Sequence, residues 1–370
     1  MQVRRRSGEL TTLKSFTNTN ILQFKAAQPS LEQPKQDVQP HSIYIVGTGG
    51  TIVGTAASAT AATYAPSQLT VEQLIESMPS LKDFGEDLHA LSLYKVNSED
   101  LTTEHWLNLG KKVNELLADP EVKGVVITHG TDTLEETAYF LDLVVKSEKP
   151  VVIVGSMRAS TSLSADGPLN LYNALAVIHA EEAKGRGVMV MMNDTIYDGR
   201  DVTKRNTTQV NTFDAPNSGS IGHVTYGQVH FERSPTRKNT TATSFDISNL
   251  EDLPRVEIVY ECAGSSGVMM KAAVESKPAG IVIAGSGDGN LHARDRAFLK
   301  YAADAGITIV RSSRTGSGYV TENDGYDFPA KEDGTIAGDN LNAQKARILL
   351  MLSLAQNSQR CEIRDNFKKY

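Results

Sequence analysis

The sequence predicts an α/β protein with two domains: a larger N-terminal parallel-type sheet with flanking helices, and a smaller C-terminal α/β domain. From His41 onward, short apolar runs alternate with longer helical patterns, which is typical of parallel strands joined by crossover helices. The chain has 370 residues, more than a single hydrophobic core usually carries. Between residues 219 and 254 the alternation gives way to Thr, Ser, Asn, Arg and Pro, which indicates a connection between two domains.

Four segments follow from this pattern. Residues 1–40 lack apolar periodicity and contain no continuous hydrophobic stretch, so they predict a flexible extension rather than a secretory signal. Their Arg and Ser content also faintly resembles an organellar transit peptide. Residues 41–232 are expected to form the N-terminal domain, 233–253 the linker and 254–370 the C-terminal domain.

Apolar runs of four or five residues predict the buried strands of both sheets. They cover residues 43–46, 125–128, 151–154, 188–192, 256–260, 281–284 and 307–311. Segments with helical periodicity predict the crossover helices, at residues 71–77, 103–117, 134–144, 169–183, 295–304 and 343–354. In the last of them Ile348, Leu349, Leu352 and Ala355 are expected to share one face.

Composition excludes several classes of protein. Hydrophobic residues make up 40% of the chain and charged residues 22%, as in ordinary globular proteins, and no apolar run approaches a membrane span. The net charge of −7 gives no basis for binding nucleic acid. Two distant cysteines and eight scattered histidines have no metal-ligand spacing, so neither a metal nor another cofactor is expected.

Two polar segments directly follow predicted strands. Gly47-Thr48-Gly49-Gly50-Thr51 follows the first strand, and its glycines allow backbone amides to approach a ligand closely. A phosphate-binding turn is the alternative, although this segment lacks the Gly-Lys-Ser/Thr of a P-loop and the spacing of dinucleotide sites. A threonine hydroxyl such as that of Thr51 becomes a nucleophile only beside an activating group.

The second segment, His129-Gly130-Thr131-Asp132-Thr133, follows the strand at 125–128. One interpretation is a simple helix N-cap, since Glu135 and Glu136 come next. The polar set is richer than capping requires, and ligands in open α/β sheets collect beyond the carboxyl ends of the strands. Thr51, Thr131 and Asp132 are therefore expected to converge on one small polar substrate.

Lys204 ends the segment Asp198-Gly-Arg-Asp-Val-Thr-Lys204, after a further strand. An exposed lysine is usually only a solvated charge. Beside Thr131 and Asp132, however, its ammonium would stabilise negative charge developing on a hydroxyl oxygen. Sequence leaves these two readings open.

Together these segments resemble the bacterial-type (type II) L-asparaginases and the glutaminase-asparaginases. The resemblance covers nearly everything from His41 to Tyr370. It is carried by ordered blocks at residues 47–52 (GTGGTI), 127–137 (ITHGTDTLEET), 164–172 (SADGPLNLY), 193–194 (ND), 199–204 (GRDVTK) and 341–347 (LNAQKAR).

The resemblance implies hydrolysis of L-asparagine to L-aspartate and ammonia, with no cofactor. Thr51 corresponds to the nucleophile that forms an acyl-enzyme, and Tyr64 to a lid tyrosine that assists its deprotonation. Thr131, Asp132 and Lys204 correspond to the second threonine, carboxylate and lysine of the same site. Mechanistically, amide hydrolysis needs an activated oxygen nucleophile, oxyanion donors and a proton for the leaving ammonia.

Substrate binding is implied at Gly50, Ser98, Glu99 and Gly130, with Ser98 binding the α-carboxylate. Many strict asparaginases carry Gln after this serine, whereas Ser98-Glu99 is more similar to the glutaminase-asparaginases. We therefore expect measurable L-glutaminase activity.

The resemblance also implies a homotetramer, a dimer of dimers in which each active site is completed by the neighbouring subunit. Asn290 corresponds to a residue that reaches the neighbour's ligand. The donated carboxylate is expected to be Glu322, with Asp324 as the alternative. Asp288 replaces an asparagine of the family's loop, and its extra charge is expected to weaken carboxylate binding.

Two further points follow from the resemblance. Ser147 stands where some bacterial members have a cysteine, so their disulfide is expected to be absent. Family members of this type are often periplasmic or secreted, but no signal peptide is recognised in this sequence and its location is left open.

Two competing functions are the amidase subunit of a tRNA amidotransferase and a non-catalytic amino-acid-binding module. The first would need an additional partner-binding domain, which is not visible. The second would not require an activated hydroxyl.

Overall fold

The computed structural model describes residues 42–56, 58, 64–65, 68–84, 87–322 and 334–370. All of these belong to one compact unit, Pro40–Tyr370. The predicted extension at 1–40 lies outside the described residues. The expectation of an α/β protein with a larger and a smaller sheet is confirmed.

The larger sheet has eight strands in the order β12-β11-β8-β7-β6-β5-β1-β4. Its parallel part consists of β4 (Leu88–Ser92), β1 (Ser42–Gly47), β5 (Val122–Thr128), β6 (Val151–Val154) and β7 (Val188–Met192). Its antiparallel edge consists of β8 (Thr195–Asp198), β11 (Gly222–Thr225) and β12 (Gln228–Phe231). The carboxyl ends of β1 and β5 are adjacent, since Gly47 pairs with Thr128.

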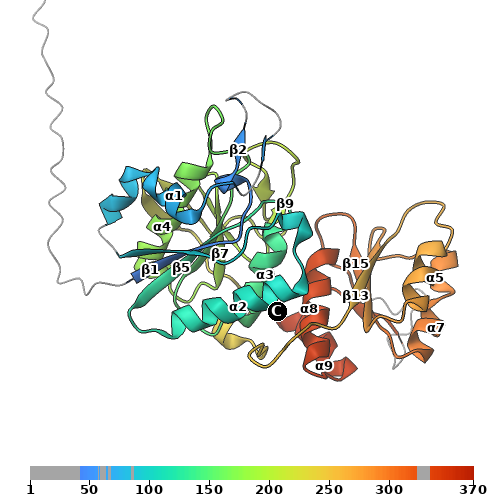
Figure 1. Ribbon diagram of the computed structural model, residues 1–370. Coiled ribbons are helices and arrows are strands. Elements are labelled where there is room, and N and C mark those ends of the chain that lie inside the picture. Colours follow the sequence, from blue (N-terminus) through green and yellow to red (C-terminus); the bar gives the residue numbers. More distant parts are fainter. Residues whose placement is uncertain (1–41, 57, 59–63, 66–67, 85–86, 323–333) are drawn as a thin grey trace, which may run out of the picture. The chain divides into compact units, whose positions relative to one another are not determined.

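Helices cover both faces of this sheet (Figure 1). They are α2 (Thr103–Ala118) and α3 (Leu134–Val144) on one face, and α1 (Val71–Glu76) and α4 (Gly167–His179) on the other. Successive strand residues alternate between the two layers: Val125 and Ile127 pack toward α2 and α3, and Val126 packs toward α1 and α4. Burial on both faces explains why the parallel strands read as continuous apolar runs.

The smaller sheet is parallel throughout, in the order β13-β14-β15-β16. Its strands are Val256–Tyr260, Gly280–Gly285, Thr308–Ser313 and Ile336–Ala337. One face carries α5 (Val268–Glu275), α6 (Ala293–Arg296) and α7 (Leu299–Asp304), and the other carries α8 (Ala343–Ala355). The helix α9 (Arg360–Lys369) packs on α8.

Helix α8 joins the two sheets, because it packs against α3 on one side and against β13, β14 and β15 on the other (Figure 1). A single apolar cluster therefore runs from the larger sheet through α8 into the smaller one. Burial of α8 extends beyond the face that carries Ile348, Leu349 and Leu352. Lys345, Ala346, Leu350 and Met351 are buried as well, since both sides of the helix face protein.

Most predicted elements agree with the structure to within a few residues. The helix predicted at 295–304 is instead divided into α6 and α7, and the one predicted at 169–183 ends as α4 and continues as a 3₁₀ turn at Glu181–Ala183. Sequence analysis missed β4, α5 and α9, and also the β11–β12 hairpin inside the stretch that had lost its alternation. These elements are short or half-exposed, so their apolar periodicity is weak.

Short elements complete the description. They are the 3₁₀ turns Thr51–Val53, Pro79–Phe84, Ser98–Asp100 and Thr240–Ala242, and the two-stranded pairs β2 (Thr55–Ala56) with β3 (Tyr64–Ala65) and β9 (Thr203–Lys204) with β10 (Phe213–Asp214). Cys262 and Cys361 are both free and exposed. In the described part of the chain, none of the helices combines the length and apolar character needed to cross a membrane.

Candidate active site

A polar pocket lies where the two sequence motifs meet, at the carboxyl ends of β1 and β5. The hydroxyl of Thr48 donates to the carbonyl of Thr128 at 2.8 Å and ties the two segments together. The pocket occupies about 330 Å³ and opens to solvent. It is lined by Gly50, Thr51, Asn97, Ser98, Glu99, Gly130, Thr131 and Asp132. Sequence analysis anticipated all of these except Asn97.

Thr51 begins a 3₁₀ turn directly after Gly50 and is buried, with 5% of its surface exposed. Gly50 has φ of 90°, a conformation that favours glycine. This backbone turns the chain away from β1, so that Thr51 faces the pocket wall formed by Gly130 and Thr131. A buried hydroxyl in a small polar pocket is well placed for a role in chemistry.

Ser98 comes from the third segment of the pocket, a 3₁₀ turn after β4. The hydroxyl of Thr133 donates to the carbonyl of Ser98 at 2.7 Å, which fixes this turn beside the second motif. The helix N-cap is Thr133, and its side chain makes no capping hydrogen bond. The interpretation of Thr131 and Asp132 as simple N-cap residues is therefore wrong, and their side chains are available for other contacts.

Lys204, at the end of β9, supplies those contacts. Its Nζ donates to Oγ1 of Thr131 at 2.9 Å and to Oδ1 of Asp132 at 2.6 Å. The Lys204 side chain is only 15% exposed, whereas that of Asp132 is 60% exposed. The interpretation of Lys204 as a solvated surface charge is therefore wrong. Its ammonium is held against a threonine hydroxyl at the pocket wall.

His129 lies beneath the second motif and is fully buried. Trp106 Nε1 donates to Thr137 Oγ1 at 3.0 Å, Thr137 Oγ1 lies 2.9 Å from His129 Nε2, and His129 Nδ1 lies 2.7 Å from the carbonyl of Gly130. Burial lowers the pKa of His129 to about 4, so the ring is neutral near pH 7. A neutral ring donates from Nδ1 and accepts at Nε2, which matches both neighbours. His129 thus supports the backbone of the turn from below.

Three predicted site residues lie elsewhere. Tyr64 is in β3, opposite Ala56, and its side chain lies outside the described part of the structure. Asn290 follows β14 and exchanges backbone hydrogen bonds with Ser286. Glu322 pairs with Lys368 Nζ at 3.0 Å and with Arg364 Nε at 3.8 Å on α9. Among the residues that line the described pocket, neither Asn290 nor Glu322 occurs. Asp324 lies outside the described residues.

The carboxylate of Asp288 accepts hydrogen bonds from the backbone N–H and the hydroxyl of Thr321, at 2.7 and 2.5 Å. The guanidinium of Arg311 donates to the backbone carbonyl of Asp288 at 3.0 Å. Asp288 therefore joins the loop that carries Asn290 to the segment that carries Glu322. The two residues expected to reach a neighbouring subunit, Asn290 and Glu322, are both exposed.

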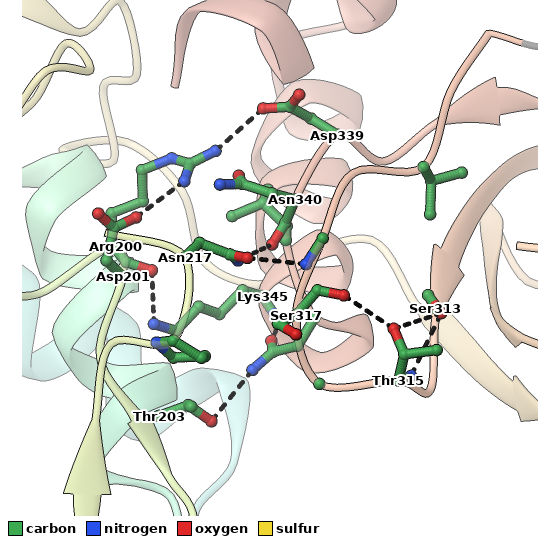
Figure 2. A pocket seen from close by; sticks show the side chains of 16 residues that line it. Arg200, Asp201, Thr203, Asn217, Ser313, Thr315, Ser317, Asp339, Asn340 and Lys345 are labelled. Atoms are coloured by element: carbon green, nitrogen blue, oxygen red, sulfur yellow. Dashed lines mark hydrogen bonds and ion pairs between the residues drawn. The ribbon is translucent and has the colours of Figure 1, made fainter. Parts of the chain in front are cut away.

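A second hollow, of about 460 Å³, lies between β9 and the loop after β15 (Figure 2). Its charges neutralise one another. Arg200 donates to Asp201 at 3.0 Å and to Asp339 at 3.3 Å, and Lys345 Nζ donates to the carbonyls of Gly199, Arg200 and Val202. We call this hollow the polar seam; it lies between the larger sheet and the segment that leads into α8. The side chains that line it carry no net charge that would attract an ion. Within the described ranges, no cluster of three or more His, Cys, Asp and Glu side chains has the geometry of a metal site.

Comparisons with known proteins identify the family of this chain. The family model for "Asparaginase, N-terminal" matches residues 42–237, and that for "Glutaminase/Asparaginase C-terminal domain" matches residues 255–367. The L-asparaginase 2 of Escherichia coli is 46% identical over 329 residues, covering 89% of this chain and 93% of the relative. The glutaminase-asparaginase of Acinetobacter glutaminasificans is 42% identical over 337 residues, covering 89% of this chain and all of the relative. A crystal structure of a probable cytoplasmic L-asparaginase from Campylobacter jejuni superposes with a TM-score of 0.86 at 42% identity, covering 89% of this chain and all of that one. The chain therefore belongs to the type II asparaginase family.

Proposed function

We propose that this protein hydrolyses L-asparagine to L-aspartate and ammonia, and L-glutamine to L-glutamate and ammonia. The observation that carries this proposal is the convergence of Thr51, Thr131, Asp132 and Lys204 on one small polar pocket. Two hydroxyls and an ammonium in a pocket of this size suit a short polar amide. A binding module would need no hydroxyl paired with a buried cation, so this arrangement favours an enzyme.

In the first half-reaction, Thr51 Oγ1 attacks the carbonyl carbon of the substrate's side-chain amide, and its proton passes to a base within the site. Tyr64 is the proposed base, with the Thr131–Lys204 pair as the alternative relay. Backbone N–H groups of the two motifs stabilise the oxyanion. The C–N bond then breaks, the nitrogen takes up a proton and leaves as ammonia, and an ester to Thr51 remains.

In the second half-reaction, water attacks the ester carbonyl and releases the acid and the free Thr51 hydroxyl. Thr131 is placed to orient this water, because the Lys204 ammonium at 2.9 Å stabilises negative charge on its Oγ1. Asp132 holds the ammonium from its other side at 2.6 Å. The three side chains act as one unit, and loss of any of them should impair turnover.

The rest of the pocket is proposed to recognise the backbone of the amino acid. Ser98 and the amides near Gly50 and Gly130 face the α-carboxylate, and the carboxylates of Asp132 and Glu99 face the α-ammonium. Both acidic side chains lie at the exposed rim of the pocket, where they attract a cation without the cost of full burial. A pocket with this charge pattern fits a zwitterion.

We also propose that the active form is a homotetramer built as a dimer of dimers. Asn290 and Glu322 would complete the pocket of the neighbouring subunit, in keeping with their position on the smaller domain. Residues 41–232 would then form the catalytic domain, 233–253 the linker and 254–370 the domain that reaches across the interface.

The test is ammonia release by purified protein with L-asparagine and, separately, L-glutamine. Thr51→Ala is expected to lose nearly all turnover, whereas Thr51→Ser, which keeps the hydroxyl, should retain part of it. Size-exclusion chromatography and circular dichroism would establish that both variants fold and assemble alike. Normal turnover by Thr51→Ala would overturn the mechanism. Absence of release by folded wild-type protein would favour a binding module or a different amide.

A further inference from the structure

Glu135 lies in the first turn of α3, three residues after Asp132, and only 3% of its surface is exposed. Its carboxylate accepts hydrogen bonds from four donors. Oε2 accepts from Thr203 Oγ1 at 2.6 Å and from the backbone N–H of Lys204 at 2.5 Å. Oε1 accepts from Asn342 Nδ2 at 2.9 Å and from Gln344 Nε2 at 2.6 Å. A buried carboxylate is stabilised in this way only when both oxygens are satisfied.

The two oxygens face two different parts of the fold. The donors to Oε2 belong to β9, the strand that carries Lys204, and the donors to Oε1 belong to the start of α8. Thr203 and Asn342 also line the polar seam of Figure 2, where Asn342 Nδ2 approaches Thr203 Oγ1 at 3.5 Å. Glu135 therefore joins α3, β9 and α8.

Strand β9 is held at its start by Lys345, which donates to the carbonyl of Val202, and at its end by the hydrogen bond from the Arg205 N–H to the carbonyl of Thr212. It contains two residues and pairs only with the two residues of β10, among the strands that the structure describes. The Lys204 ammonium must nevertheless stay within hydrogen-bond distance of Thr131 and Asp132, which precede α3. Glu135 is the side chain on α3 that fixes the Lys204 backbone relative to that same helix start.

We infer that Glu135 is a positioning residue for Lys204: its carboxylate sets the distance between β9 and α3 and thereby holds the Lys204 ammonium against Thr131. This inference rests on the proposed function, in which Lys204 acts in turnover. Glu135 does not line the pocket, so it affects the reaction only through Lys204. Its second oxygen anchors the carboxylate to α8, the helix shared by the two sheets, without contacting β9.

An amide can satisfy only one of the two pairs of donors. Glu135→Gln keeps the shape but turns one acceptor oxygen into a donor, so either the pair on β9 or the pair on α8 loses its acceptor. We expect kcat for asparagine to fall roughly 10- to 100-fold, as for small displacements of a catalytic group, with KM within about twofold of wild type. Glu136→Gln is the matched control, since it makes the same chemical change one residue along, and its kcat should stay within about twofold.

A double-mutant cycle with Lys204→Met separates positioning from simple destabilisation. If Glu135 acts through Lys204, Glu135→Gln should not lower the residual kcat of Lys204→Met further, although it should lower the melting temperature in both backgrounds. Equal losses of kcat in both backgrounds would overturn the inference and leave the proposed function intact. An unchanged kcat in Lys204→Met itself would instead refute the role of Lys204, and this inference with it.

Two variants that each remove one donor to Glu135 also test whether Glu135 positions Lys204. They need neither Lys204→Met nor a folded Glu135→Gln variant. Thr203→Val removes a donor from β9, and Gln344→Ala removes one from α8. The expected result is a severalfold lower kcat for Thr203→Val and a kcat within about twofold of wild type for Gln344→Ala, at similar losses of stability. Equal kcat values for the two variants would contradict the inference.

Discussion

The backbones of Gly50 and Gly130 are in direct contact. A Cβ atom on Gly50 would lie 2.5 Å from the nitrogen and 2.6 Å from the Cα of Gly130. A Cβ atom on Gly130 would in turn lie 2.6 Å from Oγ of Ser98. The three segments of the pocket are thus packed closely together, and Thr51 and Thr131 line the same pocket.

Gly50→Ala should therefore abolish activity although no reacting group is changed. The added methyl group meets rigid backbone and must move the Thr51 turn, so we expect at least a 100-fold loss of kcat/KM and a destabilisation of about 3 kcal/mol. Gly185→Ala is the control, because Gly185 also has positive φ, at 73°, but a Cβ there meets nothing within 4 Å. It should cost roughly 1 kcal/mol and leave turnover unchanged. Similar kinetics for the two variants would show that the contact is not needed.

Glu136 should make stability depend on pH. Burial, reinforced by the neighbouring Glu135 carboxylate, raises the pKa of Glu136 to about 7 from an ordinary value of 4.5. As pH rises through this window the unfolded chain loses its proton first, so the favourable contribution present below pH 4.5 disappears by about pH 7. Glu136→Gln removes this loss. The free energy of unfolding of this variant relative to wild type should rise by about 3 kcal/mol between about pH 5 and about pH 8, as measured by urea denaturation at both pH values. An equal offset at the two pH values would contradict the assignment.

Mixing of subunits should test whether each site is shared. Thr51→Ala and Asn290→Ala are each expected to be nearly inactive. A mixed dimer contains one Thr51→Ala subunit and one Asn290→Ala subunit. One of its two sites then combines the wild-type Thr51 of one subunit with the wild-type Asn290 of the other. Co-expression should therefore restore about one quarter of the wild-type activity, since half of the dimers are mixed and each has one intact site. No recovery in proven mixed oligomers would place both residues in the same site of one chain, whereas full activity of Asn290→Ala alone would show that Asn290 has no role.

Glu99 should influence the choice between the two amides. It lies at the exposed rim of the pocket, and glutamine is one methylene longer than asparagine, so its α-ammonium extends further toward this rim when its amide meets Thr51. Glu99→Gln is expected to lower kcat/KM for glutamine severalfold more than for asparagine. Asp100→Asn is the control: this exposed neighbour in the same turn does not line the pocket, and its variant should keep the wild-type ratio. A ratio unchanged in Glu99→Gln would refute the role.

The apolar pattern of the sequence predicted the main strands and most of the longer helices. The strands of both sheets read as apolar runs because helices cover both of their faces, and α2 follows the period of a one-sided helix. The pattern also predicted α8 as a helix, but it did not show that α8 is buried on several sides, between α3 and the smaller sheet. It failed for the exposed hairpin of β11 and β12, whose alternation is short.

The sequence by itself determined the α/β class and the polar residues at the ends of β1 and β5, because these depend on local order along the chain. Only the tertiary structure decided which distant side chains meet. Lys204 reads as an ordinary surface lysine until β9 is placed beside α3, and Glu135 reads as a helix-start residue until four donors from β9 and α8 surround it. The physical reason is that the distance between two side chains far apart in sequence is set by the packing of the elements between them, which no local pattern records.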